Sequence, residues 1–277
     1  MEIGERQRQL RLWAEQDKER RFYDLYGLLS NHDWLTAAHA SVSKHAGSAT
    51  AGTDGMHMDV FDAKYEENFG KLREELKAST FEPDPVRRAY IPKTNGTWRP
   101  LGIPSMKDRI VQEALRMLLE PIWEADFANE SYGFRPGRCT MDAVIALYNT
   151  LRGSNKTYQW IIAGDSTSYF DTIPHRQLMK CVTRRIQDKD ILELLWKFLR
   201  AGVLAKGKLR NTMTGTPQGG IMSPLLANIY LHAFDVYMRK YTALNEWSRR
   251  KRRAQGLSNF VYVRYADDCA PGNVHMR

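Results

Sequence analysis

The sequence predicts a protein of the α+β class, in which helices and short antiparallel strands alternate along one chain. Several segments repeat apolar residues at a spacing of three or four, the period of an amphipathic helix. The dipeptide Asn95-Gly96 lies between two extended runs and indicates a β-hairpin. Two further strand-like runs end in aspartate, at Asp165 and at Asp267-Asp268. Because chemistry in such proteins often lies at strand ends, these aspartates are the first candidates for a site.

Composition indicates a globular protein with an excess of positive charge. The chain has 277 residues, of which 43% are hydrophobic, enough to bury a sizeable core and unlike a collagen-like or disordered chain. Lysine and arginine number 41 against 32 acidic residues, so the net charge is +9. A basic surface favours a polyanionic partner, nucleic acid before anionic membrane.

The cysteines and the hydropathy pattern bear on the compartment. The three cysteines lie far apart without a Cys-x-x-Cys pair, so we expect no disulfide, no structural zinc site and a reducing environment. No run reaches the roughly 18 apolar residues that a membrane span needs. The first residues carry charge without an apolar core, so they are not a secretory signal. These features predict a cytoplasmic protein with no membrane partner.

Apolar spacing and flanking start or stop signals place the elements in order. The pattern predicts helices over residues 5–29, 59–79, 106–123, 141–151, 189–199 and 222–241, and a helix that Pro174 opens. Strands are predicted at residues 87–93 and 97–104 around the Asn-Gly turn, and at 158–163 and 260–265 before the aspartates. Small, glycine-containing stretches mark loops at residues 44–55, 132–138 and 215–220.

The aspartates allow two interpretations from spacing alone. Asp171 precedes Ile173-Pro174 and a helix, so a turn or cap explains it well. The adjacent carboxylates of Asp267-Asp268 repel each other unless a cation or water screens them. With Asp165 they could hold magnesium, which prefers oxygen ligands and supports phosphoryl transfer when two ions are bound. Spacing leaves both the turn and the metal interpretation open.

The sequence around these aspartates contains an ordered set of short motifs, or words. They are Tyr90-Ile-Pro-Lys93, Arg99-Pro-Leu-Gly-Ile-Pro104, Asp108-Arg109-Ile-Val-Gln112, Ser131-Tyr-Gly-Phe-Arg-Pro-Gly-Arg138, the run from Asp165 to His175, Gly215-Thr-Pro-Gln-Gly-Gly220, Ser223-Pro-Leu-Leu-Ala-Asn228-Ile229 and Tyr265-Ala-Asp-Asp268. In this order, over about residues 52–268, the set closely resembles the reverse transcriptase domain of bacterial and organellar group II intron-encoded proteins, the maturases. The final word alone recurs by chance, whereas the whole series is specific.

The resemblance implies a right-hand polymerase with fingers and a partial palm. Asp165, Asp267 and Asp268 match the three metal-binding aspartates of the palm, which bind two Mg²⁺ that activate the primer 3′-hydroxyl and neutralise the leaving group. The implied reaction is RNA-directed DNA synthesis. The implied partners are an RNA template, a DNA primer, dNTPs and group II intron RNA, in the cytoplasm of a bacterial cell.

Four further matches concern the incoming nucleotide. Lys93 and Arg99 match the fingers residues that grip the triphosphate, which suits a point charge beside a bidentate fork. Without the neighbouring words they would be two exposed hairpin cations. Phe170 matches the aromatic gate that excludes a ribose 2′-hydroxyl, with core packing as its alternative. Gln218 matches the residue that lines the nucleotide pocket near the sugar and the template.

Other residues are candidates for contact with nucleic acid. Arg135 and Arg138, and in a similar way Arg87, are expected to contact template phosphates, with solvated loop cations as the alternative. Gly219 lets the backbone approach the nucleic acid closely. The word Thr53-Asp54-Gly55 belongs to an N-terminal extension that helps clamp the template in such enzymes, and Asp54 is expected to be a structural cap.

The resemblance also divides the chain and shows departures from the family. Residues 1–51 are expected to form an N-terminal helical extension, 52–158 mainly fingers and 159–277 mainly palm, with interleaved segments. Family members continue into a thumb and a maturase region, so we expect an absent thumb and an incomplete palm. Ser166-Thr167-Ser168 follow Asp165, where the family prefers an apolar residue. Because proline donates no hydrogen bond, the strand that returns from Asp268 through Pro271 is expected to be broken.

Several functions therefore stay open. The chain is either an active reverse transcriptase or a truncated, weakly active or inactive form. A different class is a non-catalytic intron RNA-binding and splicing module, in which the aspartates are relics. Retron, diversity-generating and phage-defence reverse transcriptases share the palm, although residues 108–112 and 131–138 favour the intron family. The basic run at residues 249–253 is either a solvated loop or a binding site.

Overall fold

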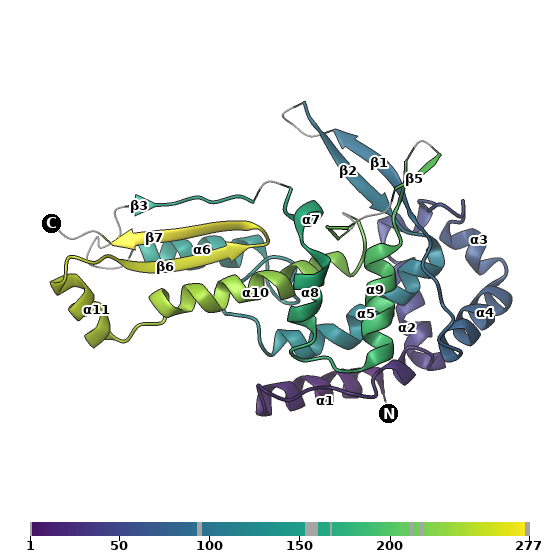
Figure 1. Ribbon diagram of the computed structural model, residues 1–277, viewed down its shortest axis with the longest axis horizontal. Helices are drawn as coiled ribbons and strands as arrows, with labels where there is room; N and C mark the ends of the chain where they lie inside the picture. The colour runs from purple at the N-terminus through teal and green to yellow at the C-terminus, as the bar shows by residue number, and fades with distance from the viewer. Residues whose placement is uncertain are drawn as a thin grey trace. The chain divides into compact units, whose positions relative to one another are not determined.

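The chain divides into two compact units, each built from two separate segments of the sequence. The computed structural model describes residues 2–92, 96–152, 160–166, 168–205, 207–210, 213–216 and 219–274. Unit 1 contains Met1–Asp126 and Phe170–Leu226, and unit 2 contains Phe127–Tyr169 and Ala227–Arg277. Helices and sheets alternate along the chain (Figure 1), which confirms the predicted mixed class.

Unit 1 is mainly helical, and unit 2 combines helices with one sheet. The elements of unit 1 are α1 (Ile3–Gln16), η1 (Tyr26–Leu28), α2 (His32–Ser43), η2 (Ala46–Ala49), α3 (Met58–Asp62), α4 (Tyr65–Lys77), β1 (Val86–Pro92), β2 (Trp98–Ile103), α5 (Met106–Glu124), α8 (His175–Val182), α9 (Lys189–Arg200), β4 (Val203–Ala205) and β5 (Lys208–Arg210). Unit 2 contains α6 (Thr140–Arg152), β3 (Trp160–Ile161), α11 (Glu246–Ala254), β6 (Asn259–Tyr265) and β7 (Asp268–Val274). Helices α7 (Tyr169–Thr172) and α10 (Ser223–Thr242) cross the segment boundaries.

Most predicted helices are confirmed, but the helix predicted over residues 5–29 is wrong beyond Gln16. The chain there leaves the helix, and Phe22 forms a parallel bridge with Ile186. The carboxylate of Asp188 accepts a hydrogen bond from the N–H of Leu25 at 2.6 Å. These contacts join positions more than 160 residues apart. They satisfy the backbone outside a helix, so tertiary pairing overrides the local apolar pattern.

Helix α5 forms the centre of unit 1. Its apolar side chains, among them Ile110, Leu115 and Leu118, are fully buried. Helices α1 and α2 both pack against it. The indole Nε1 of Trp34 in α2 donates to the Ala114 carbonyl at 3.1 Å, which satisfies a polar group that would otherwise be buried unpaired.

A proline inside α5 provides the attachment of α1. Pro121 has no N–H, so the carbonyl of Met117, four residues earlier, loses its helical partner. The side-chain amide of Gln7 in α1 donates to that carbonyl at 2.9 Å. The interruption in the helix is therefore compensated by a hydrogen bond that fixes α1 on α5.

The loop predicted at residues 44–55 is tied to the start of α5. The guanidinium of Arg109 donates to the carbonyls of Gly47 at 2.7 Å and Thr50 at 2.6 Å. The carboxylate of Asp54 accepts from the N–H of Met106, the first residue of α5, at 3.4 Å. The prediction that Asp54 is a structural cap is confirmed, and Arg109 belongs to the same anchorage.

Unit 1 carries a four-stranded sheet in the order β2-β1-β4-β5. Strands β1 and β2 pair antiparallel up to Pro92 opposite Trp98, which confirms the predicted hairpin. The turn residue Asn95 and the candidate Lys93 lie outside the described residues. Strands β4 and β5 were not predicted, because three residues are too few to reveal an alternating pattern.

Unit 2 contains a three-stranded antiparallel sheet in the order β3-β7-β6. Helix α6 packs against β6 and lies behind the hairpin in Figure 1. The prediction that the returning strand is broken is wrong, since β7 continues through Pro271. Gly164 and Cys269 exchange two hydrogen bonds of 2.8 Å. Because backbone N–H groups alternate in direction along a strand, the nitrogen of Pro271 points the same way as that of Cys269, away from β6. It faces the segment between β3 and Gly164, so no bond to β6 is lost.

The carboxyl group of Asp108 is an unusual member of the core. Its Oδ2 atom accepts from the N–H of Asp84 at 3.0 Å, whereas Oδ1 is buried without a hydrogen-bond partner in the described part of the chain. It adjoins a cavity of about 20 Å³ that Gln112 and Thr216 also line. Burial, and then the charge of Asp84, raise the pKa of Asp108 to about 8.

We predict that Asp108→Asn removes a pH dependence from the stability of the protein. Because its pKa is raised in the folded state, Asp108 keeps a proton that the unfolded chain releases above about pH 4. The free energy of unfolding should therefore fall as the pH rises from about 4 to about 8, and then level off.

Urea titrations near both ends of this window test the prediction. Asp108→Asn should lose the fall and should be more stable than the wild type at the alkaline end. Asp59→Asn, in the first turn of α3 and exposed, is the control. The same pH dependence in the wild type and in Asp108→Asn would contradict the prediction.

Candidate functional site

The three predicted aspartates lie together at one end of the sheet in unit 2. Strands β6 and β7 are joined by the two-residue turn Ala266-Asp267, and β7 begins at Asp268. Asp165 follows Gly164, which is bridged to Cys269. In an antiparallel pair this register places Asp165 directly opposite Asp268.

Electrostatic repulsion acts between these carboxylates. Asp165 and Asp268 are exposed and Asp267 is half-buried. Partial burial, and then the charges of Asp267 and Asp165, raise the pKa of Asp268 above its ordinary value. A cation placed among the three groups would relieve the repulsion.

The donor set fits a hard divalent cation that shares its shell with other ligands. Carboxylate oxygens are the ligands that Mg²⁺ prefers, and Mg²⁺ usually keeps waters or substrate phosphates as well. In the residues that the structure describes, no three His, Cys, Asp or Glu side chains are arranged to hold a metal ion by themselves. Because Asp165 and Asp268 are exposed, an ion held there would have room for waters or phosphate oxygens beside the carboxylates.

The turn that carries Asp267 has a strained backbone that its surroundings hold in place. Ala266 has φ of +55°, where glycine or asparagine is usual in a hairpin turn of this length. Its side chain is buried. A Cβ atom on Gly133 would lie 2.3 Å from the Ala266 nitrogen, so only glycine permits this approach. The loop predicted at residues 132–138 thus packs directly against the turn.

Arg264 of β6 joins the segments around the turn through one buried guanidinium. It is 1% exposed and forms two bonds to Asp235, at 2.8 and 2.6 Å. It also donates to Asn228 Oδ1 at 2.9 Å, to the Ala266 carbonyl at 2.7 Å and to Ser131 Oγ at 2.7 Å. Three of the ordered sequence words therefore meet at this side chain.

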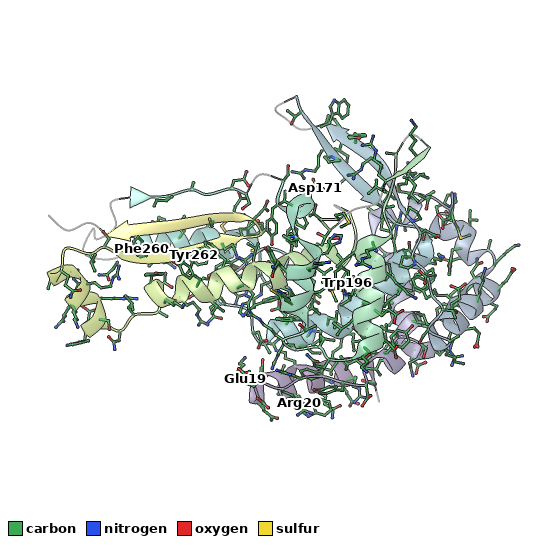
Figure 2. All side chains as sticks on the ribbon, viewed as in Figure 1. Glu19, Arg20, Asp171, Trp196, Phe260 and Tyr262 are labelled. Carbon is green, nitrogen blue, oxygen red and sulfur yellow. The ribbon has the colours of Figure 1, made fainter. Side chains whose placement is uncertain are left out.

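Two more hydrogen bonds complete the network. The hydroxyl of Tyr262, labelled on β6 in Figure 2, donates to Asp235 at 2.9 Å. The amide of Asn228 donates to the Gly133 carbonyl at 2.8 Å. Sequence reasoning missed Arg264 and Asp235. The available sequence signal was the alternation of side chains between the two faces of β6. Arg264 falls two residues after Tyr262 and therefore lies on the same buried face.

The residues predicted to contact the nucleotide that the structure describes lie in unit 1. Arg99 is exposed on β2, opposite Ile91. Phe170 is half-buried in α7, and its carbonyl accepts from the Thr216 N–H at 2.7 Å. Gln218 lies outside the described residues, as does Lys93.

Gly219, in the loop predicted at residues 215–220, lies close to strand β2. Its φ is +105°, and a Cβ atom there would lie 2.9 Å from the Gly102 carbonyl of β2. A cavity of about 690 Å³ opens beside it. Ile91 and Leu101 line this cavity with Gly219, and Arg109, Arg116 and Glu113 add charged groups to a wall that is otherwise mainly apolar.

The arginines predicted to contact nucleic acid have different environments. Arg135 is buried and donates to the carbonyls of Ala128 and Ser131 at 2.7 and 2.8 Å, which favours a structural role. Arg138 is half-buried and donates to the Asn129 carbonyl at 2.6 Å. Arg87, half-buried in unit 1, donates to the Ala51 carbonyl at 3.0 and 2.7 Å.

Among the described helices, none has the length and apolar content to cross a membrane.

Comparisons with known proteins agree with this geometry. Residues 91–272 match the family described as reverse transcriptase (RNA-dependent DNA polymerase). Protein YkfC of Escherichia coli is 41% identical over 97% of this chain and 75% of its own length. The group II intron-encoded protein LtrA of Lactococcus lactis is 40% identical over 78% of this chain, which spans about a third (35%) of LtrA.

The fold also has counterparts among solved structures. A chain of a partial Cas6-RT-Cas1–Cas2 complex aligns with 90% of this chain, at a TM-score of 0.55 and 20% identity, over 38% of its own length. At this identity the likeness concerns the fold alone. It supports the mixed helix-and-sheet architecture described above.

We predict that Arg264→Met lowers the free energy of unfolding by about 3–5 kcal/mol, because Asp235 is left buried without its cation. Urea unfolding measures the loss. The double variant Arg264→Met/Asp235→Leu should recover part of it, since no unpaired charge remains.

Arg11→Met removes an exposed ion pair with Glu15 and serves as the control, with an expected change below about 1 kcal/mol. If Arg264→Met were no more destabilising than this control, the network would not hold the turn.

We predict opposite thermal shifts for two aspartates of unit 2. The pKa of Asp268 is raised, so its ionisation above about pH 4 opposes folding, and Asp268→Asn should raise the Tm at neutral pH. The hydrogen bond from the Cys139 N–H, at 2.7 Å, lowers the pKa of Asp142, so Asp142→Asn should lower the Tm.

Differential scanning fluorimetry with and without millimolar Mg²⁺ extends this comparison. Mg²⁺ should raise the Tm of the wild type by a few degrees, and that of Asp268→Asn by less. Equal Mg²⁺ shifts in both proteins would show that these carboxylates do not bind the ion.

Proposed function

The chain belongs to the group II intron-encoded reverse transcriptase and maturase family, and on that premise we propose that it catalyses RNA-directed DNA synthesis. The observation that carries the proposal is the register that sets Asp165 opposite Asp268, beside Asp267, at an exposed sheet end. The matching family model covers these residues and all of the sheet except the last two residues of β7. We assign the sheet of unit 2 to the palm and the β1–β2 hairpin to the fingers.

The carboxylates of Asp165, Asp267 and Asp268 would hold two Mg²⁺ ions. When bound, the metal supplies charge neutralisation at the reacting phosphate and lowers the pKa of the attacking hydroxyl. The raised pKa of Asp268 supports this role, because the folded protein keeps like charges close together. The Arg264 network keeps their strand ends in register while these groups remain open to solvent.

The residues of unit 1 are proposed to bind the incoming dNTP. Arg99, exposed on β2, and Lys93 provide the cations for the triphosphate. Phe170 is proposed to exclude a 2′-hydroxyl, and Gln218 is proposed to line the nucleotide pocket near the sugar and the template. Gly219 is proposed to let the backbone approach the nucleic acid closely. Its close approach to β2 supports this role, since the loop is held by β2 on one side and by α7 on the other.

The proposed partners are an RNA template, a DNA primer and group II intron RNA. The net charge of +9 supports a nucleic-acid partner. Arg138 and Arg87 are proposed phosphate contacts, because both residues are only half-buried. Arg135 supports its loop from within and is the weaker candidate.

A non-catalytic RNA-binding and splicing module is the second candidate. The basic charge favours it as strongly as it favours a polymerase. The two functions differ in their need for the carboxylates, because RNA binding alone gains nothing from three adjacent negative charges. Substitution of the aspartates therefore separates them.

Primer extension on an RNA template with dNTPs and Mg²⁺ tests the proposal. Wild type should extend the primer, whereas Asp268→Asn and Asp165→Asn should lose at least about 100-fold in rate, because the metal ligands are incomplete. Asp142→Asn, in the same unit, is the control and should retain activity. Absence of extension by a folded wild type that still binds RNA would favour the splicing module.

A further inference from the structure

Helix α11 concentrates positive charge that the proposed polymerase site does not use. Its sequence, EWSRRKRRA, contains five consecutive cations at residues 249–253 and one acid, Glu246. The helix therefore carries a net charge of +4, from five cations minus one acid. Glu246 is shared by Arg250 at 3.2 Å and Arg253 at 3.1 Å, so one carboxylate faces two guanidinium groups.

An aromatic side chain stands beside these cations. Trp247 is 69% exposed, an unusual exposure for the largest side chain. The Nζ atom of Lys251, one turn along the helix, lies 5.3 Å from its ring centroid. The side chain of Arg250 is 74% exposed. Together, Trp247, Arg250 and Lys251 form what we call the α11 surface.

Two other cations of α11, Arg249 and Arg252, anchor the helix. Arg252 donates to the Ser258 carbonyl at 3.2 and 2.7 Å, and Arg249 donates to the Thr242 carbonyl of α10 at 3.3 Å. The Asn259 amide at the start of β6 donates back to the Arg249 carbonyl at 3.2 Å. The helix is thus fastened at both ends, and the α11 surface is held on a fixed support.

The end of α10, which leads into α11, repeats the combination of cations and aromatic rings. Arg239 and Lys240 lie in its last turn. The ammonium of Lys240 lies 5.6 Å from the ring centroid of Tyr237, which is 50% exposed. Cations therefore alternate with exposed rings along more than one helix of unit 2.

The α11 surface is distinct from the carboxylates in the same unit. Helix α11 precedes the first residue of β6, whereas the turn with Asp267 follows the last residue. Seven residues of strand separate the two ends, which is about 20 Å. Figure 1 shows α11 at the end of β6 that is opposite the turn, and Figure 2 labels Phe260 near that end.

We propose that the α11 surface binds single-stranded RNA, with phosphates on Arg250 and Lys251 and an unpaired base stacked on Trp247. Unpaired bases stack on aromatic rings, and adjacent cations follow the backbone. A membrane-binding helix needs a broad apolar face, whereas α11 offers one ring among cations. The choice of RNA as the polyanion rests on the proposed function, but the binding itself needs no polymerase activity.

Binding of a fluorescent oligouridylate by the full chain tests the proposal, with EDTA present so that metal at the carboxylates plays no part. Arg250→Gln/Lys251→Gln should weaken binding about tenfold at low salt and should reduce the salt slope by about 1.4, at about 0.7 for each phosphate contact. Trp247→Ala should weaken binding about fivefold or more, and Trp247→Phe should retain most of it.

Lys64→Gln/Lys77→Gln is the matched control, since it removes two exposed cations that pair with Glu67 and Glu74 in unit 1. It should leave the affinity within about twofold of the wild type and the salt slope unchanged. Failure of primer extension with these results intact would overturn the polymerase and leave the α11 surface standing.

Three outcomes would overturn the proposal. One is an unchanged affinity and salt slope in the α11 variants. Another is a loss that the Lys64→Gln/Lys77→Gln control reproduces, which would reflect total charge. The third is a loss of binding to phosphatidylglycerol vesicles with RNA affinity unchanged, which would assign the surface to anionic lipid.

Discussion

The ion pair between Arg264 and Asp235 is the constraint on which the organisation of unit 2 depends. Both side chains are buried, at 1% and 0% exposed, so either charge alone would carry a large desolvation cost. The remaining donors of Arg264 are then committed to Ser131, Asn228 and Ala266. One guanidinium thereby fixes residues that lie as many as 133 positions apart in the sequence.

Stability and chemistry are separated within this unit. The buried polar groups of Arg264, Tyr262 and Asp235 are bonded to one another, whereas the end of the hairpin combines a strained alanine with neighbouring carboxylates. Strain and repulsion persist only where surrounding structure determines the conformation, and they concentrate at functional sites. The buried Arg264 network therefore stabilises the strained turn next to it, and with it the positions of Asp267 and Asp268.

Backbone hydrogen bonds explain how the fold accommodates prolines inside a helix and inside a strand, where proline is usually unfavourable. Pro121 interrupts α5, and the freed carbonyl is occupied by Gln7. Pro271 lies in the central strand of a sheet, but its nitrogen faces away from β6, toward the segment between β3 and Gly164. At Pro121 the freed carbonyl has another donor, and at Pro271 the pairing with β6 loses no bond, so neither proline disrupts the element that contains it.

By itself the sequence determined the family, most helices and the β1–β2 hairpin, and it predicted the three aspartates as the candidate site, because ordered motifs and apolar periods are local signals. Tertiary structure decided what depends on distant partners. It ended α1 at Gln16, carried β7 through Pro271 and turned Arg135 inward. It also revealed Arg264, since one arginine in an apolar strand acquires its meaning only from the Asp235 that folding places 2.6 Å away.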